Sequence, residues 1–458
     1  MFAAALFLVF ALAPVAAQEP AAAQESASVR PGSWLDPLFH FPRWCEQPTA
    51  GSSYEVVAGE VGADGLLADL EGPGVLRRIW LPRARGSLAL AVEDREPFLV
   101  LDLAGELPEP FQGPLVRRQG GAFESLVPVP FDRRLRLSGP AGLSFRLEIE
   151  RRPEADGLVS PEVGLRPAQL EHYRLASDLI ETGEFLVQPR RRTSAFGRIR
   201  TNSRLTASIN RAGTVLGWRL EITNYQDLDP VELLRGLRLR VAADRQVQID
   251  VPAGDFLGAS CALPTGAGHL LRLVEEPGIG LVLSSNLPMP FADSIRVIFI
   301  NESLQVPLCR LYLYFTEEVL SPWRLHAAWQ LHRDLSGRCR VRVADLDGPG
   351  RLIGAAVALR RTGFDGGLDP TGFFGLPPGP VVAFAAPFTT VTVGNGWTGL
   401  ARLLPGTGVP FAENHVLEIP LEIGAEEVDA ASLCWWYAPA DAGHRHGELP
   451  DPTDRALR

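Results

Sequence analysis

Two aspartates in the C-terminal half of the chain have a spacing that could support catalysis. Asp365 and Asp369 lie four residues apart in the glycine-rich segment 363–375. Two carboxyl groups can act as acid and nucleophile on a glycosidic bond if the fold holds them at a suitable separation. Asp and Gly are also the residues that turns favour, and we prefer this second interpretation, a solvent-exposed turn without chemistry.

No other combination of residues predicts a metal or cofactor site. The closest histidine pairs, His326 with His332 and His444 with His446, have no further ligands at metal-binding spacing. Neither a nucleophile elbow nor a dinucleotide fingerprint occurs in its proper context. We therefore predict no metal and no cofactor.

The charge of the chain argues against several classes of partner. With 54 acidic against 44 basic residues the net charge is −10, so the chain should repel a phosphate backbone and we expect no nucleic-acid partner. Every basic residue is arginine. The absence of lysine excludes Schiff-base chemistry and a phosphate-binding P-loop. A length of 458 residues predicts two or three domains.

The first residues are typical of an exported protein. Residues 1–17 form an apolar run closed by small residues, with Val15 and Ala17 at the −3 and −1 positions of a cleavage site. We predict a signal peptide rather than a membrane anchor, a linker over 18–48 and a secreted or periplasmic location. No later segment is long and apolar enough for a stable membrane span.

The five cysteines give no metal or redox motif. They are far apart and odd in number, so at least one thiol is unpaired within the chain; they are Cys45, Cys261, Cys309, Cys339 and Cys434. Two of these, Cys309 and Cys434, lie in apolar runs, where we expect buried free thiols.

Short alternating segments between Gly and Pro predict an all-β fold. Residues 75–80, 88–92, 143–149, 294–300 and 308–315 have the pattern of half-buried strands. Segment 167–181 is the one predicted helix, because its apolar residues recur at helical spacing between Pro167 and Gly183. Strands every 8–12 residues without regular helices favour jelly-roll β-sandwiches.

Repeated turns indicate that two related sandwiches follow one another. The segment Pro128-Val129-Pro130-Phe131 is answered 160 positions later by Pro288-Met289-Pro290-Phe291. We therefore predict a double jelly roll, with one sandwich at 49–232, a second at 233–445 and a tail at 446–458.

Five segments of the chain form a specific combination: LADLEGPGV at 67–75, VPAGDFLG at 251–258, NLPMPF at 286–291, HAAW at 326–329 and WWYAP at 435–439. They resemble, in the same order, conserved segments of glycoside hydrolase family 172, earlier known as domain of unknown function 2961. The resemblance implies a double jelly roll that forms trimers or larger assemblies. It also implies action outside the cytoplasm on fructose- or arabinose-containing glycans.

The family's catalytic residues have no counterpart in this chain. The family resembles retaining glycosidases in using two glutamates, which lie between the HAxW and WYA motifs. No glutamate occurs between Glu318 and Glu413 here, and the acids in that interval are all aspartates: Asp334, Asp345, Asp347, Asp365 and Asp369. The family's N-terminal signature is also lost at 45–51. The chain resembles the framework of the family without its catalytic pair.

Aromatic residues provide the candidates for glycan binding. Trp397, in the segment GNGWTG, is the best surface candidate, because sugars stack on rings with polar neighbours. Most other tryptophans lie in strand-like runs, where core packing explains them. The motifs that match the family add Asp255, His326 and Trp329 to Trp397 as candidate substrate-binding residues.

Three functions are compatible with these observations. The favoured prediction is a secreted, non-catalytic subunit for glycan binding or assembly that forms homo-oligomers such as trimers. One alternative is an active glycosidase in which Asp365 and Asp369 act as relocated acids. Another is a structural envelope or shell protein.

Overall fold

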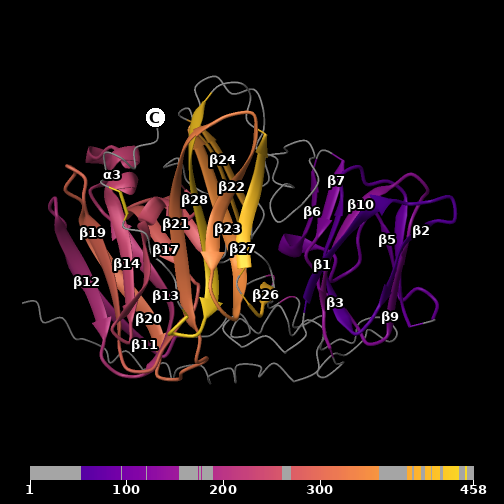
Figure 1. The fold of residues 1–458 in the computed structure, drawn as a ribbon, viewed down its shortest axis with the longest axis horizontal. Helices are drawn as coiled ribbons and strands as arrows, with labels where there is room; N and C mark the ends of the chain where they lie inside the picture. The colour runs from indigo at the N-terminus through magenta and orange to yellow at the C-terminus, as the bar shows by residue number, and fades with distance from the viewer. Residues whose placement is uncertain are drawn as a thin grey trace, which may run out of the picture.

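The chain folds into β-sandwiches, as the sequence predicts (Figure 1). The computed structural model describes residues 53–93, 95–119, 121–153, 174, 177, 189–259, 270–360, 389–394, 397–403, 408–413, 415–422, 427–442 and 449–450. Within this described part 61% of the residues are in strands and 6% in helices. Residues 1–52, with the predicted signal peptide and linker, and the segment containing Asp365 and Asp369 lie outside it.

The first sandwich, at the right of Figure 1, consists of two antiparallel sheets. One sheet has the order β1 (Ser53–Glu60), β10 (Ser144–Arg151), β3 (Gly74–Leu81), β7 (Ala122–Ser125), β6 (Val116–Gln119), and β8 (Val129–Phe131) also pairs with β3. The other has the order β2 (Leu66–Glu71), β9 (Arg134–Ser138), β4 (Ser87–Val92), β5 (Leu99–Asp102).

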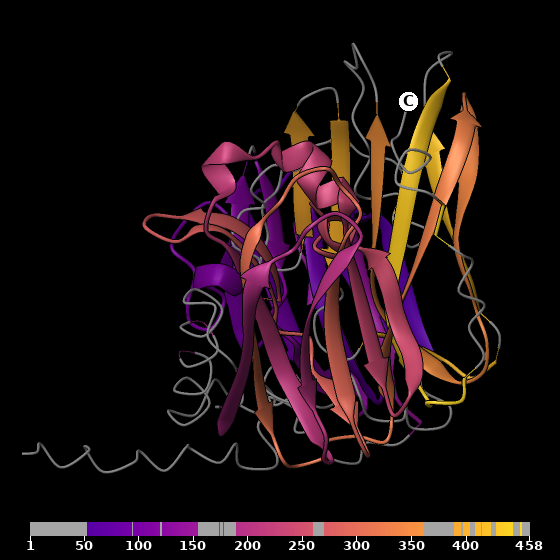
Figure 2. The same ribbon diagram turned by 90° about the vertical axis from the view of Figure 1, so that its left-hand side faces the viewer.

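The second sandwich, at the left of Figure 1 and nearest the viewer in Figure 2, repeats this order strand by strand. Its first sheet contains β11 (Arg191–Arg198), β20 (Leu308–Thr316), β13 (Gly213–Ile222), β17 (Gly280–Ser285) and β16 (Leu271–Glu276), with β18 (Met289–Phe291) beside β13. Its second sheet contains β12 (Ser203–Ile209), β19 (Ile295–Asn301), β14 (Leu237–Ala243) and β15 (Gln246–Pro252).

The third sandwich lies between the other two in Figure 1. Its larger sheet contains β21 (Arg324–Leu335), β28 (Val428–Ala438), β23 (Gly350–Arg360), β25 (Trp397–Leu403) and β24 (Thr389–Gly394), with β26 (Val409–Phe411) beside β23. Opposite it, β22 (Arg338–Leu346) pairs with β27 (His415–Glu422). Because β21 runs parallel to β15, the second and third sandwiches share one ten-stranded sheet.

The tandem jelly rolls are therefore residues 191–438, and residues 53–151 form a further sandwich of the same strand order. The predicted boundary at residue 232 falls inside the second sandwich. Strands β12 and β13 precede it, yet they pair with β19 and β20, which follow it. Each sheet joins strands from both ends of a repeat, so a boundary placed by spacing along the sequence divides the sandwich.

The repeated P-x-P-F turns lie at equivalent positions, which confirms the repeat. The three-residue strand ending in Phe131 pairs with the start of β3, and the strand ending in Phe291 pairs with the start of β13. The structure adds a third copy, Val409-Pro410-Phe411, which pairs with the start of β23. In each copy the phenylalanine lies opposite a glycine: Gly74, Gly213 and Gly350.

The same β-bulge follows this glycine in all three sandwiches. The register between the central strand and its neighbour shifts by one residue, three positions after the glycine. The extra residues are Arg77, Leu216 and Ile353. A bulge at a fixed position bends the strand in the same way each time, so the three sandwiches share their local geometry as well as their order.

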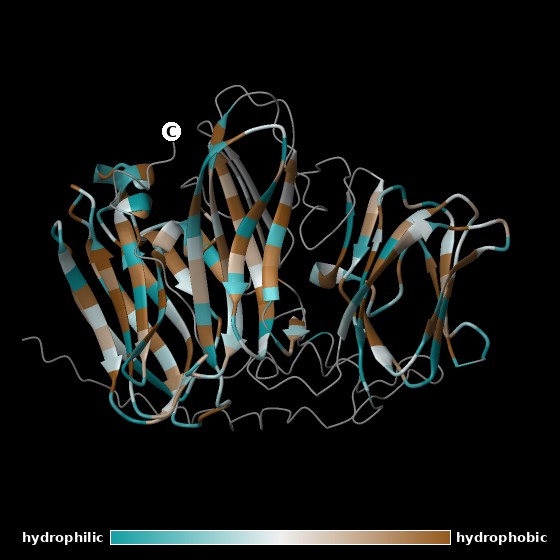
Figure 3. Cartoon of the chain, viewed as in Figure 1, coloured by the Kyte–Doolittle hydropathy of each residue, from teal (hydrophilic) through white to brown (hydrophobic). Residues whose placement is uncertain are grey.

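Alternation of side chains builds the cores, as the hydropathy colours along the strands show (Figure 3). In β9, Leu135 and Leu137 are buried and their neighbours point outward. Strand β28 is buried along its whole length, because both faces of its sheet are covered. Of the predicted free thiols, Cys309 and Cys434 are buried without a disulfide, and burial raises the pKa of each to about 12.

The helices are short. Only Arg174 and Ser177 of the predicted helix 167–181 lie in the described part, and both are helical. Two helices that the sequence analysis missed are α3 (Pro230–Gly236) and α4 (Ala253–Phe256). Asp229 caps α3 by accepting hydrogen bonds from the N–H groups of Val231 and Glu232. In the described part, no helix is long and apolar enough to span a membrane.

Candidate functional site

Two of the predicted binding residues meet at the junction of the second and third sandwiches. Asp255 lies in α4 and accepts a hydrogen bond from the indole N–H of Trp329 in β21. The guanidinium of Arg235 is 3.8 Å from the same carboxylate oxygen. Because Asp255 is only 3% exposed, we interpret this group as a paired buried charge that orders the junction.

His326 does not join that group. Alternate residues of a strand face opposite sides, and the three-residue spacing places His326 on the other side of β21 from Trp329. There His326 is 2% exposed and stacks on Trp436, with ring centroids 5.3 Å apart. Like Asp255, it presents almost no surface to a ligand.

Three motifs of the family resemblance converge on the same junction, whereas the motif at 67–75 lies in the first sandwich. Phe256 of α4 packs edge-on against Trp435 of β28, with centroids 6.2 Å apart. The hydroxyl of Tyr437 donates a hydrogen bond of 2.7 Å to the carbonyl of Pro288, next to the Met-Pro-Phe strand. Three separate motifs, at 251–258, 286–291 and 435–439, therefore pack together and hold the second sandwich against the third.

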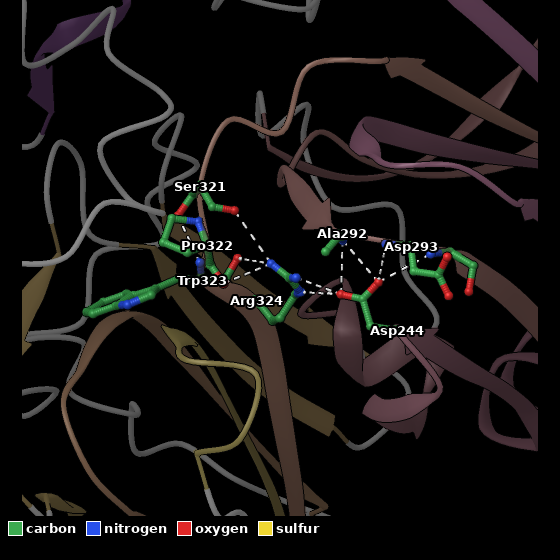
Figure 4. Close-up of polar contacts among 8 residues, drawn as sticks. Asp244, Ala292, Asp293, Ser321, Pro322, Trp323 and Arg324 are labelled. Carbon is green, nitrogen blue, oxygen red and sulfur yellow. Dashed lines mark hydrogen bonds and ion pairs between the residues drawn. The ribbon is translucent and has the colours of Figure 1, made fainter.

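An ion pair between Asp244 and Arg324 forms a second contact at this junction (Figure 4). Asp244 follows β14 and accepts hydrogen bonds from the backbone N–H groups of Ala292 (3.0 Å) and Asp293 (2.7 Å). Arg324, the first residue of β21, donates to the same carboxylate at 2.9 and 2.6 Å. Burial alone would raise the pKa of Asp244, but the backbone and arginine hydrogen bonds hold it below its ordinary value.

The remaining predicted residues cannot be placed in a site. Trp397 begins β25, where its backbone pairs with Arg360 and Gly394, but its side chain is outside the described part. Asp365 and Asp369 are also outside it. Catalysis by the two aspartates and binding by Trp397 therefore stay predictions. No cluster of three metal-ligating side chains occurs in the part of the chain that the structure describes.

The outer face of the β11–β20 pair is an accessible candidate binding surface in the described part of the chain. Outward-facing residues of β11 and β20 carry rings and guanidinium groups: Phe196 is 61% exposed, and the guanidinium of Arg310 lies 5.4 Å from its ring centroid. Arg192 lies in the same way 5.1 Å from the ring of Tyr312. The ring centroids of Tyr312 and Tyr314 are 6.4 Å apart. We call Arg192, Phe196, Arg310, Tyr312 and Tyr314 the open face.

The equivalent face of the first sandwich is buried and ionic. Arg78 donates to Glu124 at 2.6 Å and to Glu148 at 2.8 Å, and Tyr54 donates to the other oxygen of Glu148. Glu148 is 2% exposed. Although burial alone would lower the pKa of Arg78, the charges of Glu124 and Glu148 raise it above its ordinary value.

The equivalent face of the third sandwich is also covered. Register places Trp435 of β28 where β10 has Glu148 and β20 has Tyr314. Trp435 is fully buried against Phe256 of α4, and Gly258 lies directly against Ala401 of β25. Among the described residues of the three equivalent faces, only those of the second sandwich are open along the first two strands.

Sequence reasoning missed the open face because it contains no motif. One signal was present, since β11 alternates Arg192, Ser194, Phe196 and Arg198 on one side. An exposed phenylalanine in an otherwise polar row is unusual for a surface strand. The row alone does not show that the strand is at the edge of a sheet and that its outward side chains are exposed in the described structure.

Comparisons with known proteins identify only distant structural similarity. No family model and no curated protein matches the chain. The major capsid protein P2 of bacteriophage PM2 is 12% identical, with a TM-score of 0.36 over 56% of this chain and 100% of its own. VP54 of PBCV-1 is 8% identical with a TM-score of 0.30, and the STIV major capsid protein is 8% identical with a TM-score of 0.29. Each match covers 55% of this chain and 97% of the other protein. Similarity at this level carries no information about function.

Proposed function

We propose that the protein is a non-catalytic structural subunit, secreted or periplasmic, that associates with further copies of itself through the open face. The observation that carries the proposal is the contrast among three equivalent sheet faces. Those of the first and third sandwiches are buried within the chain, whereas that of the second exposes Phe196 and its arginine neighbours. A second copy is the occupant that would cover this face as the other two are covered.

The placement of the family-like motifs supports a structural role. Asp255, Trp329, Trp435 and Tyr437 are engaged in contacts between the second and third sandwiches. Membership in glycoside hydrolase family 172 would account for this shared framework, and the missing glutamate pair would account for a lack of hydrolysis.

Sedimentation velocity at micromolar concentration tests the association. We expect a trimer or larger assembly for the unchanged chain and monomers for a Phe196→Ser, Tyr312→Ser variant. The matched control is Leu304→Ser, which removes an apolar side chain that is 82% exposed away from the open face and should leave the assembly intact. A monomeric unchanged chain, or a double variant that assembles normally, would overturn the proposal.

Glycan binding on the same face is a second candidate. Exposed rings beside arginines can stack against sugar C–H faces and bond to hydroxyl groups. Labelled fructans and arabinans, scored for binding and for hydrolysis together, test it. Saturable binding that Phe196→Ser abolishes would support a glycan-binding role. Turnover that Asp365→Asn or Asp369→Asn abolishes would instead establish a glycosidase and contradict the non-catalytic proposal.

A further inference from the structure

A groove lies beside the open face, where β11 and β12 separate into the two sheets of the second sandwich. It has a volume of about 630 Å³. Its lining comes from the start of β11, the end of β12, the turn that follows and one residue of β20: Arg191, Arg192, Thr193, Ser208, Ile209, Asn210, Arg211 and Phe315. Residues from both sheets and a turn thus meet around one opening.

The groove has an excess of positive charge. Arg191, Arg192 and Arg211 contribute three positive charges, and no lining residue is acidic. The nearest counter-charge is Glu317, whose Oε1 accepts from Arg191 Nε at 3.1 Å and from Arg211 Nη1 at 2.5 Å. Among the residues that the structure describes at the groove, three arginines against one carboxylate give a formal charge of +2, on a chain whose net charge is −10.

Aromatic rings hold two of these arginines in place. The guanidinium of Arg211 lies 5.6 Å from the ring centroid of Phe315, which is 4% exposed and forms an apolar floor. Arg192 is held over Tyr312 at 5.1 Å. A stacked guanidinium loses less freedom when it binds, and its planar set of donors suits a carboxylate or sulfate group.

The neutral residues of the groove indicate which class of ligand bears the anionic group. Thr193, Ser208 and Asn210 offer hydroxyl and amide groups, which match the hydroxyl groups of a sugar ring. The net charge of the chain opposes any long polyanion, so binding would depend on the local positive charge of the groove. A polysaccharide places hydroxyl groups beside each anionic group, where these neutral side chains can contact them.

We propose that this groove binds the carboxylate or sulfate group of an acidic polysaccharide. Arg191 and Arg211 hold the anionic group, Arg192 adds a third donor set at the edge of the open face, and the neutral side chains contact the sugar. The groove shares Arg192 with the open face, whereas Arg191 and Arg211 lie outside that face. Substitution of Arg191 and Arg211 therefore tests the groove without altering the exposed rings.

Titration of the full chain with polygalacturonate, chondroitin sulfate and neutral dextran tests the site. We expect saturable binding of at least one acidic polymer, which weakens as NaCl is added, and no binding of dextran. Polygalacturonate alone would identify a carboxylate ligand, and chondroitin sulfate alone a sulfated one. Equal binding of dextran, or tighter binding of poly-glutamate than of either polymer, would overturn the polysaccharide assignment.

Three variants locate the binding. Arg191→Gln with Arg211→Gln should weaken it at least tenfold, whereas Arg340→Gln, at an exposed arginine of the third sandwich, should leave it unchanged. Glu317→Gln removes the carboxylate that pairs with Arg191 and Arg211 and should tighten binding about threefold, the size of one exposed ion pair. A gain of affinity cannot come from unfolding. Weaker binding by Glu317→Gln, or unchanged binding by the arginine double variant, would refute the site.

Discussion

The outer faces of the first and second sandwiches occupy the same position in the same strand order, yet they differ in burial and in how their charges are paired. In the first, Arg78 lies between Glu124 and Glu148 and the group is buried. In the second, the corresponding register positions hold Gly217 and Tyr314, and the neighbouring strand exposes Phe196. Outward positions of a repeated sheet can diverge because the sandwich core does not depend on them.

This difference separates charges that stabilise the fold from charges that can bind a ligand. A buried charge must be paired, because removing its partner leaves an uncompensated charge in a medium of low dielectric constant. An exposed arginine stays hydrated and can exchange water for a ligand. Substitutions in the first face are therefore expected to lower the stability of the fold. Substitutions in the second face are expected to weaken association and to leave stability nearly unchanged.

Arg78→Met should have the largest effect on stability. It leaves Glu124 and Glu148 without their shared arginine, and breaking a buried pair costs about 3–5 kcal/mol. Arg310→Met on the open face should change the free energy of unfolding by no more than about 0.5 kcal/mol. Urea denaturation of both variants measures the contrast, which equal losses would contradict.

Gly213→Ala should have the next largest effect. A Cβ atom there would lie against the backbone carbonyl of Thr316 and 3.4 Å from the ring of Phe291. Overpacking of this kind costs about 1–3 kcal/mol. The control is Gly197→Ala in β11, where the nearest atom, of Leu205, is 4.0 Å away, and this variant should be as stable as the unchanged chain. Thermal unfolding of the two variants tests how closely the chain packs around Gly213.

Lowering the pH should weaken the Asp244–Arg324 contact. The pKa of Asp244 is lowered from 3.8 in the folded chain, so its contribution is present above that value and is lost as the pH falls below it. The stability difference between the unchanged chain and Asp244→Asn, about 1–3 kcal/mol at neutral pH, should shrink as the pH falls below 3.8.

The first sandwich provides the control for that pH dependence. Glu93 follows β4 as Asp244 follows β14, but it accepts from the N–H of Arg133 at 3.2 Å and pairs with a side chain that is 82% exposed. Glu93→Gln should therefore have a smaller effect than Asp244→Asn at every pH. An equal or larger effect of Glu93→Gln would contradict the assignment of Asp244 to the junction.

Phe196→Ser should have the smallest effect on folding. The side chain is 61% exposed, so its removal should change the free energy of unfolding by about 0.5 kcal/mol or less. A large loss of stability in the monomer would mean that the open face is part of the core packing. Urea denaturation in dilute solution, where association is absent, separates the two roles.

Much of the fold could be predicted because its signals are local. Alternating apolar residues indicate strands, and the repeated P-x-P-F segment indicates repeated sandwiches. The third copy at 409–411 was missed because it lacks the leading proline. The boundary at 232 was wrong because strands such as β11 and β20 pair across more than a hundred residues.

The candidate site could be predicted only in part. Asp255 and Trp329 do meet, whereas His326 lies on the opposite side of the same strand, which the two-residue period of a strand could have indicated. The sequence did not indicate the groove, because Arg191 and Arg211 pair with Glu317, which follows Arg211 by more than a hundred residues in the chain.

By itself, the sequence determined the all-β class, the repeated turn and the buried free thiols at Cys309 and Cys434, because each follows from residue type and short-range spacing. Only the tertiary structure decided which of three equivalent faces is open and which side chains surround the groove. Those properties depend on what packs against a strand, and strands far apart in the chain supply those contacts.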